Sequence, residues 1–230
     1  MKLETLDALL AARAAKRAVA LVTALDGHSE WVVEPGAPPS GLPADLLEAV
    51  RQALASDRSG VVEHDGRDWF VQAHNPPLRM LIVGAVHITQ ALAPMAAMAG
   101  YEVTVIDPRR GFAAAERFPG VRVDGDWPDE ALERLVPDAR TAVVTLTHDP
   151  KLDDPALHVA LRSEAFYIGC LGSRRTHAAR LDRLRNAGFD DADCARLHGP
   201  AGLDLGARSP AEIAVSVLAE TVRALRRPEG

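Results

Sequence analysis

Residues 78–96 read LRMLIVGAVHITQALAPMA and set the architecture of most of the chain. An apolar run ends at Gly84 and a helix-like apolar periodicity follows it, which predicts a strand, a tight turn and a helix. A dinucleotide-binding turn has the pattern G-x-G-x-x-G. Here Val86 and Thr89 stand at the second and third glycine positions. The stretch is therefore a strand-to-helix joint with an incomplete nucleotide signature.

Beyond this joint, short apolar runs alternate with stretches of helical periodicity. The runs are 80–83, 101–106, 141–146 and 165–171, with a weak one at 121–123, and the helical stretches are 87–99, 128–136, 154–162, 174–187 and 210–226. Such alternation buries a parallel sheet between helices, with right-handed crossovers. We expect an α/β fold with a doubly wound, mostly parallel Rossmann-like sheet of strand order 3-2-1-4-5.

The first part of the chain has a different pattern. Helical periodicity at 3–16 and 43–55 is combined with apolar runs at 18–24, 30–34, 61–64 and 68–73, and the dipeptides Asp26-Gly27 and Asp65-Gly66 are typical of hairpin turns. Pro76 and Pro77 then interrupt any regular element. The sequence predicts a small α+β domain over 1–75 and a Rossmann-like domain over 76–230.

Composition excludes several classes of protein. The 230 residues are 47% hydrophobic and 25% charged, with a net charge of -6, which is typical of a soluble globular protein and argues against nucleic-acid binding. Cys170 and Cys194 lie outside any C-x-x-C, so we expect neither a disulfide framework nor a metal site. The N-terminus is unlike a signal peptide, and no window approaches the ~20 apolar residues of a membrane span. We expect a cytoplasmic protein without membrane contact.

Candidate ligand-binding residues gather where the predicted strands end. In this kind of sheet, ligands bind outside the carboxyl ends of the strands. The residues at these ends are Gly84 and His87 after the first strand, Asp107 and Arg109 after the second, His148 and Asp149 after the fourth, and Gly172, Ser173, Arg174 and Arg175 after the fifth. Gly202 and Asp204 belong to a glycine-rich loop, 199–206, before the last helix. We interpret all twelve as candidate cofactor-binding residues.

Several of these residues have a structural interpretation as well. Asp107 lies 23 positions after Gly84, close to the offset of about 20 at which an acid binds a ribose hydroxyl, but it is equally a loop acid before a proline. Arg109 or Arg110 could hold a 2′-phosphate or be solvated. His87 could face the ligand or be merely exposed. The loop 199–206 could approach a ligand or be a compact connection.

The acidic segment after the fourth strand also has two interpretations. His148 and Asp149, with Asp153 and Asp154 close behind, resemble part of a metal site. However, Asp154-Pro155 is typical of a helix N-cap followed by proline at the first helical position, and we favour that structural interpretation.

The segment Gly172–Arg175 is the stronger anion candidate. A glycine-serine turn that opens a helix offers free backbone N–H groups and the positive end of the helix dipole. Two guanidinium groups add charge-assisted donors. By contrast, Ser209-Pro210-Ala211-Glu212 is explained by a capping box with proline at the first helical position.

Five successive blocks then carry a family resemblance. They are LIVGAVHITQALA, GYEVTVIDPR with ERFPGV, TAVVTLTHDPKLDDPAL, FYIGCLGSRRTHAARLDRL and GPAGLDLGARSPAEIAVSVLAE. In this order they resemble the Rossmann-like domain of the xanthine dehydrogenase accessory (XdhC/CoxI) family, over about residues 79–222. The resemblance implies a protein that binds molybdenum cofactor, as molybdopterin or its dinucleotide form. It further implies delivery of the mature, sulfur-bearing cofactor to a molybdenum hydroxylase such as xanthine dehydrogenase, with a sulfurtransferase as a second partner.

The chain departs from the family in two places. Many members carry glycine at the position of Val86, and residues 1–75 have no counterpart of the glycine-rich, cysteine-containing segment of the family's N-terminal domain. The valine should obstruct a standard dinucleotide pose.

We therefore expect an accessory protein for the maturation or insertion of molybdenum cofactor. Two alternatives stay open. An NAD(P)-dependent oxidoreductase is disfavoured because no Tyr-x-x-x-Lys pair is visible, and a non-catalytic nucleotide-sensing interaction module would bind no redox cofactor. The residues leave open whether the protein is an enzyme and whether it forms a homodimer.

Overall fold

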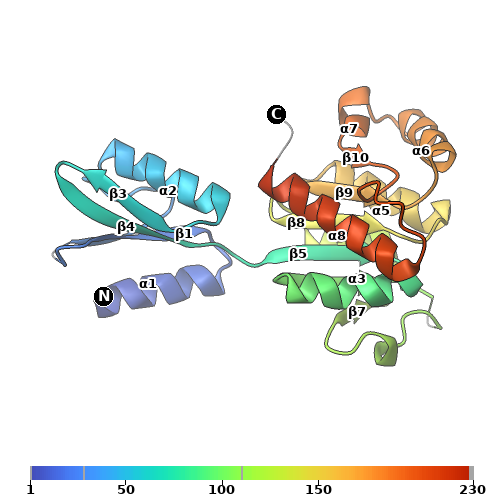
Figure 1. Cartoon of the computed structure of the whole chain (residues 1–230), viewed down its shortest axis with the longest axis horizontal. Helices are drawn as coiled ribbons and strands as arrows, with labels where there is room; N and C mark the ends of the chain where they lie inside the picture. Colours follow the sequence, from blue (N-terminus) through green and yellow to red (C-terminus); the bar gives the residue numbers. More distant parts are fainter. Residues whose placement is uncertain (1, 28, 110, 228–230) are drawn as a thin grey trace. The chain divides into compact units, whose positions relative to one another are not determined.

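The computed structural model describes residues 2–27, 29–109 and 111–227. The chain divides into two compact units, Met1–Pro76 and Pro77–Gly230 (Figure 1). The division falls at the two consecutive prolines, where neither a helix nor a central strand can continue.

The N-terminal unit is a four-stranded antiparallel sheet with two helices. Its strands follow the order β2-β1-β4-β3. The elements are α1 (Leu3–Ala14), β1 (Val19–Ala24), β2 (Glu30–Val33), α2 (Ala44–Ser56), β3 (Gly60–His64) and β4 (Arg67–His74). Leu46 and Val50 of α2 are buried against Val22 and Val71 of the sheet, and this apolar contact gives the unit a core of its own.

The C-terminal unit is built on a six-stranded parallel sheet. Its elements are β5 (Leu78–Val83), α3 (His87–Met98), β6 (Tyr101–Ile106), the 3-10 turn η1 (Ala115–Arg117), β7 (Arg122–Asp124), α4 (Pro128–Leu135), β8 (Thr141–Thr145), α5 (Pro150–Leu161), β9 (Tyr167–Cys170), α6 (Arg174–Asn186), α7 (Asp191–Ala195), β10 (Leu197–His198) and α8 (Pro210–Arg226). The strand order is β10-β9-β8-β5-β6-β7, which confirms the predicted α/β fold and its 3-2-1-4-5 order and adds β10 at one edge.

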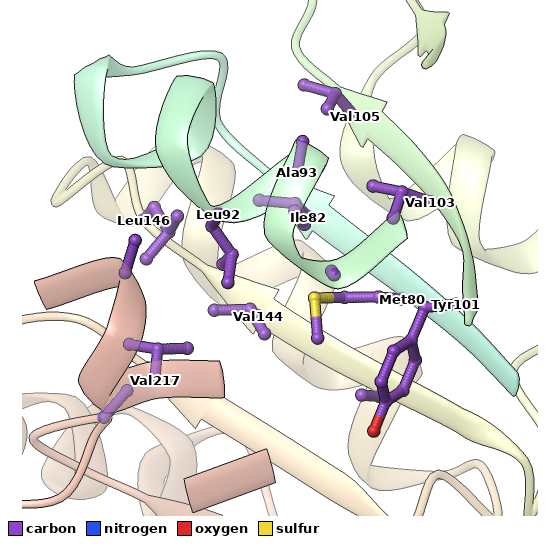
Figure 2. Packing of buried hydrophobic residues seen from close by; sticks show 14 of the residues in the cluster. Met80, Ile82, Leu92, Ala93, Tyr101, Val103, Val105, Val144, Leu146 and Val217 are labelled. Atoms are coloured by element: carbon purple, nitrogen blue, oxygen red, sulfur yellow. The ribbon is translucent and has the colours of Figure 1, made fainter. Parts of the chain in front are cut away.

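Alternate side chains of the central strand β5 enter two separate cores. Met80 and Ile82 lie in a cluster with Leu92 of α3 and Val217 of α8 (Figure 2). Leu81 and Val83 lie in the second cluster, which includes apolar residues of α4, α5 and α6. Because successive strand residues point to opposite faces, β5 is apolar at every position from Met80 to Val83, and burial of each large side chain contributes roughly 1.5–3 kcal/mol.

One predicted boundary is wrong. The helix after β8 begins at Pro150 rather than at residue 154, with Asp149 as its N-cap, and Pro155 lies within the helix. Pro150 is well placed because the N–H groups of the first helical turn have no intrahelical acceptor, whereas Pro155, in the second turn, removes one i→i−4 hydrogen bond. The Asp154-Pro155 pair is therefore not the helix start that the sequence suggested.

Two short elements escaped the sequence analysis. Helix α7 and strand β10 have five and two residues, too few for an apolar period to be recognised. A signal for α7 was nevertheless present, because Asp190 and Asp193 form a capping box at its start.

None of the described helices is both long and apolar enough to cross a membrane. Among the described residues, no group of three or more histidine, cysteine, aspartate or glutamate side chains could hold a metal ion.

Candidate functional site

The carboxyl ends of β5 and β8 meet at a glycine. Gly84 directly follows β5 and has φ of +109°, and a Cβ atom placed there would lie 2.6 Å from Cγ2 of Thr147, which follows β8. The left-handed backbone and the lack of space both require glycine at this position. Gly84 therefore has a structural reason to be a glycine, whether or not a ligand approaches the turn.

The turn after Gly84 is tied to the loop after β6. The Ala85 N–H donates to Oδ2 of Asp107 at 2.8 Å, and the Ala85 carbonyl accepts from the Arg117 guanidinium at 2.8 Å. Arg117 also donates to the carbonyl of Phe112 and to Gln90 on α3. Both backbone polar groups of Ala85 are thus held by the β6–β7 connection.

Asp107 is buried beneath Arg109. Its side chain is 0% exposed, and it accepts from the backbone N–H, Nε and Nη2 of Arg109 as well as from Ala85. Burial raises the pKa of the Asp107 carboxyl, but these hydrogen bonds outweigh that effect and hold its pKa below the usual value. The expected contact of Asp107 with a ribose is not accessible in this arrangement.

Val86 and Thr89 fill the positions of the two missing glycines. Val86 precedes α3 as its N-cap residue and packs against the apolar core, and Thr89 is fully buried with its hydroxyl donating to the Gly84 carbonyl. No side chain among the described residues caps α3. His87, the first residue of that helix, is exposed.

The loop after β8 is held by a buried carboxyl group. Thr147 donates to Oδ1 of Asp153 at 2.6 Å, and its hydroxyl also accepts from the Asp149 N–H. Asp149 accepts from the Lys151 N–H and so caps α5. This predicted site residue therefore has a structural role. His148, between them, is exposed and has a left-handed φ of +61°.

The turn after β9 opens α6 with the geometry that the sequence suggested. Gly172 has φ of +144°, and Ser173 is the N-cap residue, whose Oγ accepts from the Thr176 N–H at 3.1 Å. Arg174 and Arg175 are exposed on the first turn. Neither guanidinium has a hydrogen bond or an ion pair within the described part of the chain. The helix start therefore combines free backbone donors with two unpaired cations.

Arg180 is a buried cation that sequence reasoning missed. It is 2% exposed, and its Nη2 donates to the Leu171 carbonyl at 3.0 Å and lies 3.9 Å from Asp153. Its Nε and Nη1 are buried without a hydrogen-bond partner among the described residues. The available signal was its helical spacing from His177 and Leu184, which places the three on the inner face of α6.

Both cysteines are buried. Cys170 ends β9 and is 0% exposed, and Cys194 in α7 is 6% exposed. Burial raises the pKa of the Cys170 thiol to about 11 and also raises the pKa of Cys194. At neutral pH both thiols are therefore protonated and enclosed, unlike reactive cysteines.

The glycine-rich loop after β10 is fastened to α8. The Gly202 N–H donates to Glu220 at 2.7 Å, and a Cβ at Gly202 would lie 2.4 Å from Oγ of Ser216. Gly202 thus lets the loop approach α8 closely. This packing explains the glycine without the need for a ligand. Asp204, further along the loop, is exposed.

The fold brings most of the predicted residues to one edge of the sheet. The hydrogen bond to Asp107 raises the pKa of Arg109, which follows β6. The carboxylates of Asp149 and Asp153, which follow β8, raise this pKa further. Basic side chains collect at this edge: His87, His148, Arg174 and Arg175 are exposed, and Arg109 is partly buried. An edge with the N-termini of α3, α5 and α6 and these donors can bind an anionic ligand.

A cavity of about 440 Å³ lies elsewhere in the same unit. Its lining includes Leu132, Val136, Val159 and Arg162. These residues end α4 and α5 and precede β8 and β9, so the cavity belongs to the amino-terminal edge of the sheet. We place the candidate site at the carboxyl edge because the free donors are there.

Comparison with known proteins gives related sequences and a related fold. The family described as the XdhC Rossmann domain matches residues 80–221. The uncharacterized protein YqeB of Escherichia coli K12 is 32% identical over 180 residues, 77% of this chain and 32% of that protein. The molybdenum cofactor insertion chaperone PaoD of the same strain is 32% identical over 151 residues, 66% of this chain and 41% of that protein. The matched regions span less than half of either relative.

The crystal structure of a xanthine dehydrogenase from Bacillus halodurans has the same fold. The TM-score is 0.74 at 23% identity, over 98% of this chain and 65% of that chain. The likeness extends over the N-terminal unit as well as the parallel sheet.

Proposed function

Because the chain belongs to the XdhC family, to which residues 80–221 match, we propose that it binds molybdenum cofactor and assists its insertion into a molybdenum hydroxylase. The name of its relative PaoD, a molybdenum cofactor insertion chaperone, supports this proposal. A client such as xanthine dehydrogenase is the corresponding partner. Once inserted, the cofactor supplies molybdenum redox chemistry to the client, and the role of this chain is to bind and release it.

One observation carries the proposal. The N-terminus of α6 combines unpaired backbone donors with the exposed guanidinium groups of Arg174 and Arg175. Molybdopterin ends in a phosphate, and its dinucleotide form contains a pyrophosphate, so that either form presents an anion to such a site. Behind the same turn, the buried Nε and Nη1 of Arg180 have no hydrogen-bond partner among the described residues, and this positive group adds to the potential at the anchor.

The other helix starts at this edge are less suited to the anion. Helix α5 is already capped by the carboxylate of Asp149, which accepts from the Lys151 N–H. Its negative charge disfavours an anion at this helix start. In the described part of the chain, no side chain caps helix α3, but Val86 stands where a pyrophosphate would need a glycine. We therefore assign the phosphate to Ser173, Arg174 and Arg175, with His87 and His148 as further donors to the ligand.

The proposal gives this chain no sulfur-transfer step. A persulfide carrier needs an accessible thiolate, and the thiols of Cys170 and Cys194 are buried with raised pKa values. The sulfur of the mature cofactor then comes from a partner, such as a sulfurtransferase, or arrives with the cofactor.

The NAD(P)-dependent oxidoreductase is the second candidate, and two features oppose it. Val86 packs into the core at the pyrophosphate position, and the Asp107 carboxylate is covered. A nucleotide-sensing module would share both obstacles if it used the standard dinucleotide pose. Retained ligands identified by native mass spectrometry distinguish the three functions.

The direct test is cofactor binding by an arginine variant. Two charge-assisted contacts of roughly 1.5–3 kcal/mol each imply that Arg174→Ala with Arg175→Ala weakens binding of molybdenum cofactor at least about a hundredfold. Binding is measured as molybdenum and pterin that co-elute with the protein after gel filtration. A control, Arg13→Ala with Arg51→Ala, removes the same charge from exposed arginines of the N-terminal unit. Equal retention by both double variants would refute the anchor, and no retention by the unmodified chain would refute the function.

A further inference from the structure

The Asp107 carboxylate has no acceptor position left for a ligand. Oδ1 accepts from the Arg109 N–H at 3.0 Å and from Arg109 Nε at 2.9 Å. Oδ2 accepts from the Ala85 N–H at 2.8 Å and from Arg109 Nη2 at 2.7 Å. A carboxylate offers about four acceptor sites, and all of them are used.

An acid at the end of the second strand normally binds the vicinal hydroxyls of a ribose. Here Arg109 supplies three of the four donors that replace those hydroxyls. We propose that Arg109 is a specificity-determining residue that closes the ribose position and makes the site select a ligand with an anionic group at the end of β6. This inference rests on the proposed function, because it concerns the same carboxyl edge.

The guanidinium is held in place by more than the carboxylate. Its central carbon lies 4.4 Å from the ring centroid of Phe112, a cation–π contact. Phe112 belongs to the connection that Arg117 fastens to Ala85 and to Gln90 of α3. A ligand that needs Asp107 must therefore break a bidentate ion pair and also disturb this connection, at a cost that its own hydroxyl contacts hardly offset.

Arg109 also presents a hydrogen-bond donor to a ligand that carries a phosphate. Its Nη1 has no hydrogen-bond partner in the described part of the chain, and 35% of its side chain is exposed. The carboxylates of Asp149 and Asp153, which follow β8, also attract the Arg109 guanidinium. However, Asp149 already accepts from the Lys151 N–H, and burial raises the pKa of Asp153. A phosphate is the group that fits this remaining donor, because it forms charge-assisted hydrogen bonds with arginine.

The test compares two probes that differ by one phosphate. ADP-ribose carries a vicinal diol on its adenosine ribose, and 2′-phospho-ADP-ribose carries a phosphate there. Arg109→Ala uncovers Asp107 and removes the donor, so we expect it to raise ADP-ribose affinity at least about tenfold and to lower affinity for the phosphorylated probe. Calorimetric titrations are made in the natural sequence and with Val86→Gly, because the valine blocks the pyrophosphate of both probes.

Controls separate selectivity from damage to the fold. Arg109→Gln keeps one side-chain amide donor for Asp107. We therefore expect its gain in ADP-ribose affinity, and its loss of affinity for the phosphorylated probe, to be smaller than those of Arg109→Ala. Asp107→Asn added to Arg109→Ala should abolish the gain for ADP-ribose. Thermal melts verify that each variant is folded. If neither Arg109→Ala nor Arg109→Gln gains ADP-ribose affinity in either background, the inference is overturned.

The same proteins are assayed for retention of molybdenum cofactor, which keeps the two proposals distinguishable. A change of probe preference without any cofactor retention would support Arg109 as the selecting residue and refute the accessory function. Cofactor retention with an unchanged probe preference would support the accessory function and refute Arg109 as the selecting residue.

Discussion

The Arg180 guanidinium lies 3.9 Å from the Asp153 carboxylate, and both side chains are almost fully buried at the carboxyl edge of the sheet. Asp153 also accepts from Thr147, and Arg180 also donates to the Leu171 carbonyl. The pair thus connects the end of β8 with the end of β9. Removal of one partner leaves the other buried without its counter-ion.

We expect Asp153→Ala to lower the free energy of unfolding by about 3–5 kcal/mol, because it leaves the buried Arg180 without its counter-ion and removes the acceptor of the Thr147 hydroxyl at 2.6 Å. Asp154→Ala is the matched control. Its ion pair with Arg183 is nearer to solvent, with Arg183 39% and Asp154 16% exposed, so we expect a smaller loss than for the buried pair. Urea unfolding measures both variants, and equal losses would show that the Asp153–Arg180 pair has no special role.

Gly84→Ala should destabilise the protein more than Gly100→Ala. Both glycines have positive φ, +109° and +92°, and so share a conformational cost of roughly 1–2 kcal/mol. Only at Gly84 would the new Cβ meet Thr147, and such overpacking adds about 1–3 kcal/mol. Thr147→Ser should recover part of the additional loss, since it removes Cγ2 and keeps the hydroxyl for Asp153. Equal melting temperatures of the two alanine variants would contradict the contact.

Glu220 should make the stability of the protein depend on pH in the acid range. It accepts from the Tyr167 hydroxyl and the Gly202 N–H, each at 2.7 Å, and lies 3.6 Å from His198. Burial alone would raise the pKa of Glu220, but these partners lower it to about 2 from its ordinary 4.5. Because the folded pKa is the lower one, the stabilisation is complete above pH 4.5 and is lost as the pH falls toward 2.

The corresponding variant is Glu220→Gln. The depressed pKa of Glu220 corresponds to roughly 3 kcal/mol, and the variant should lack this pH-dependent part. Melting temperatures from pH 6 to about 2 should therefore fall more steeply for the unmodified chain than for the variant. Parallel curves would show that the Glu220 carboxylate is not stabilised by its contacts in the folded state.

His148 should be dispensable for folding and important for cofactor binding. It is exposed at φ of +61°, which costs a histidine more than a glycine. We expect His148→Gly to leave the melting temperature unchanged or raise it, and to lower cofactor retention if the imidazole contacts the ligand. His148→Ala should lose the same retention but melt somewhat lower. Full retention by both variants would remove His148 from the site.

The sequence alone was sufficient for the order of five of the six parallel strands. A strand buried on both faces must be apolar at consecutive positions, as 80–83 and 142–144 are, and this signal does not depend on distant residues. Right-handed crossovers then leave few topologies. The same local reasoning found the capped turns at Ser173 and Ser209, because capping depends on residues three positions apart.

Only the tertiary structure decided which polar residues are available to a ligand. Asp107 has the position of a ribose-binding acid, yet Arg109 and the Ala85 N–H occupy it. Arg180 is one of five arginines in α6, and burial distinguishes it from Arg174 and Arg175. Motif spacing locates a side chain along the chain, whereas hydrogen bonding and burial depend on neighbours that the fold supplies from other strands and helices. The carboxyl edge could therefore be predicted from the sequence, and the division of its residues into exposed donors and internal supports could not.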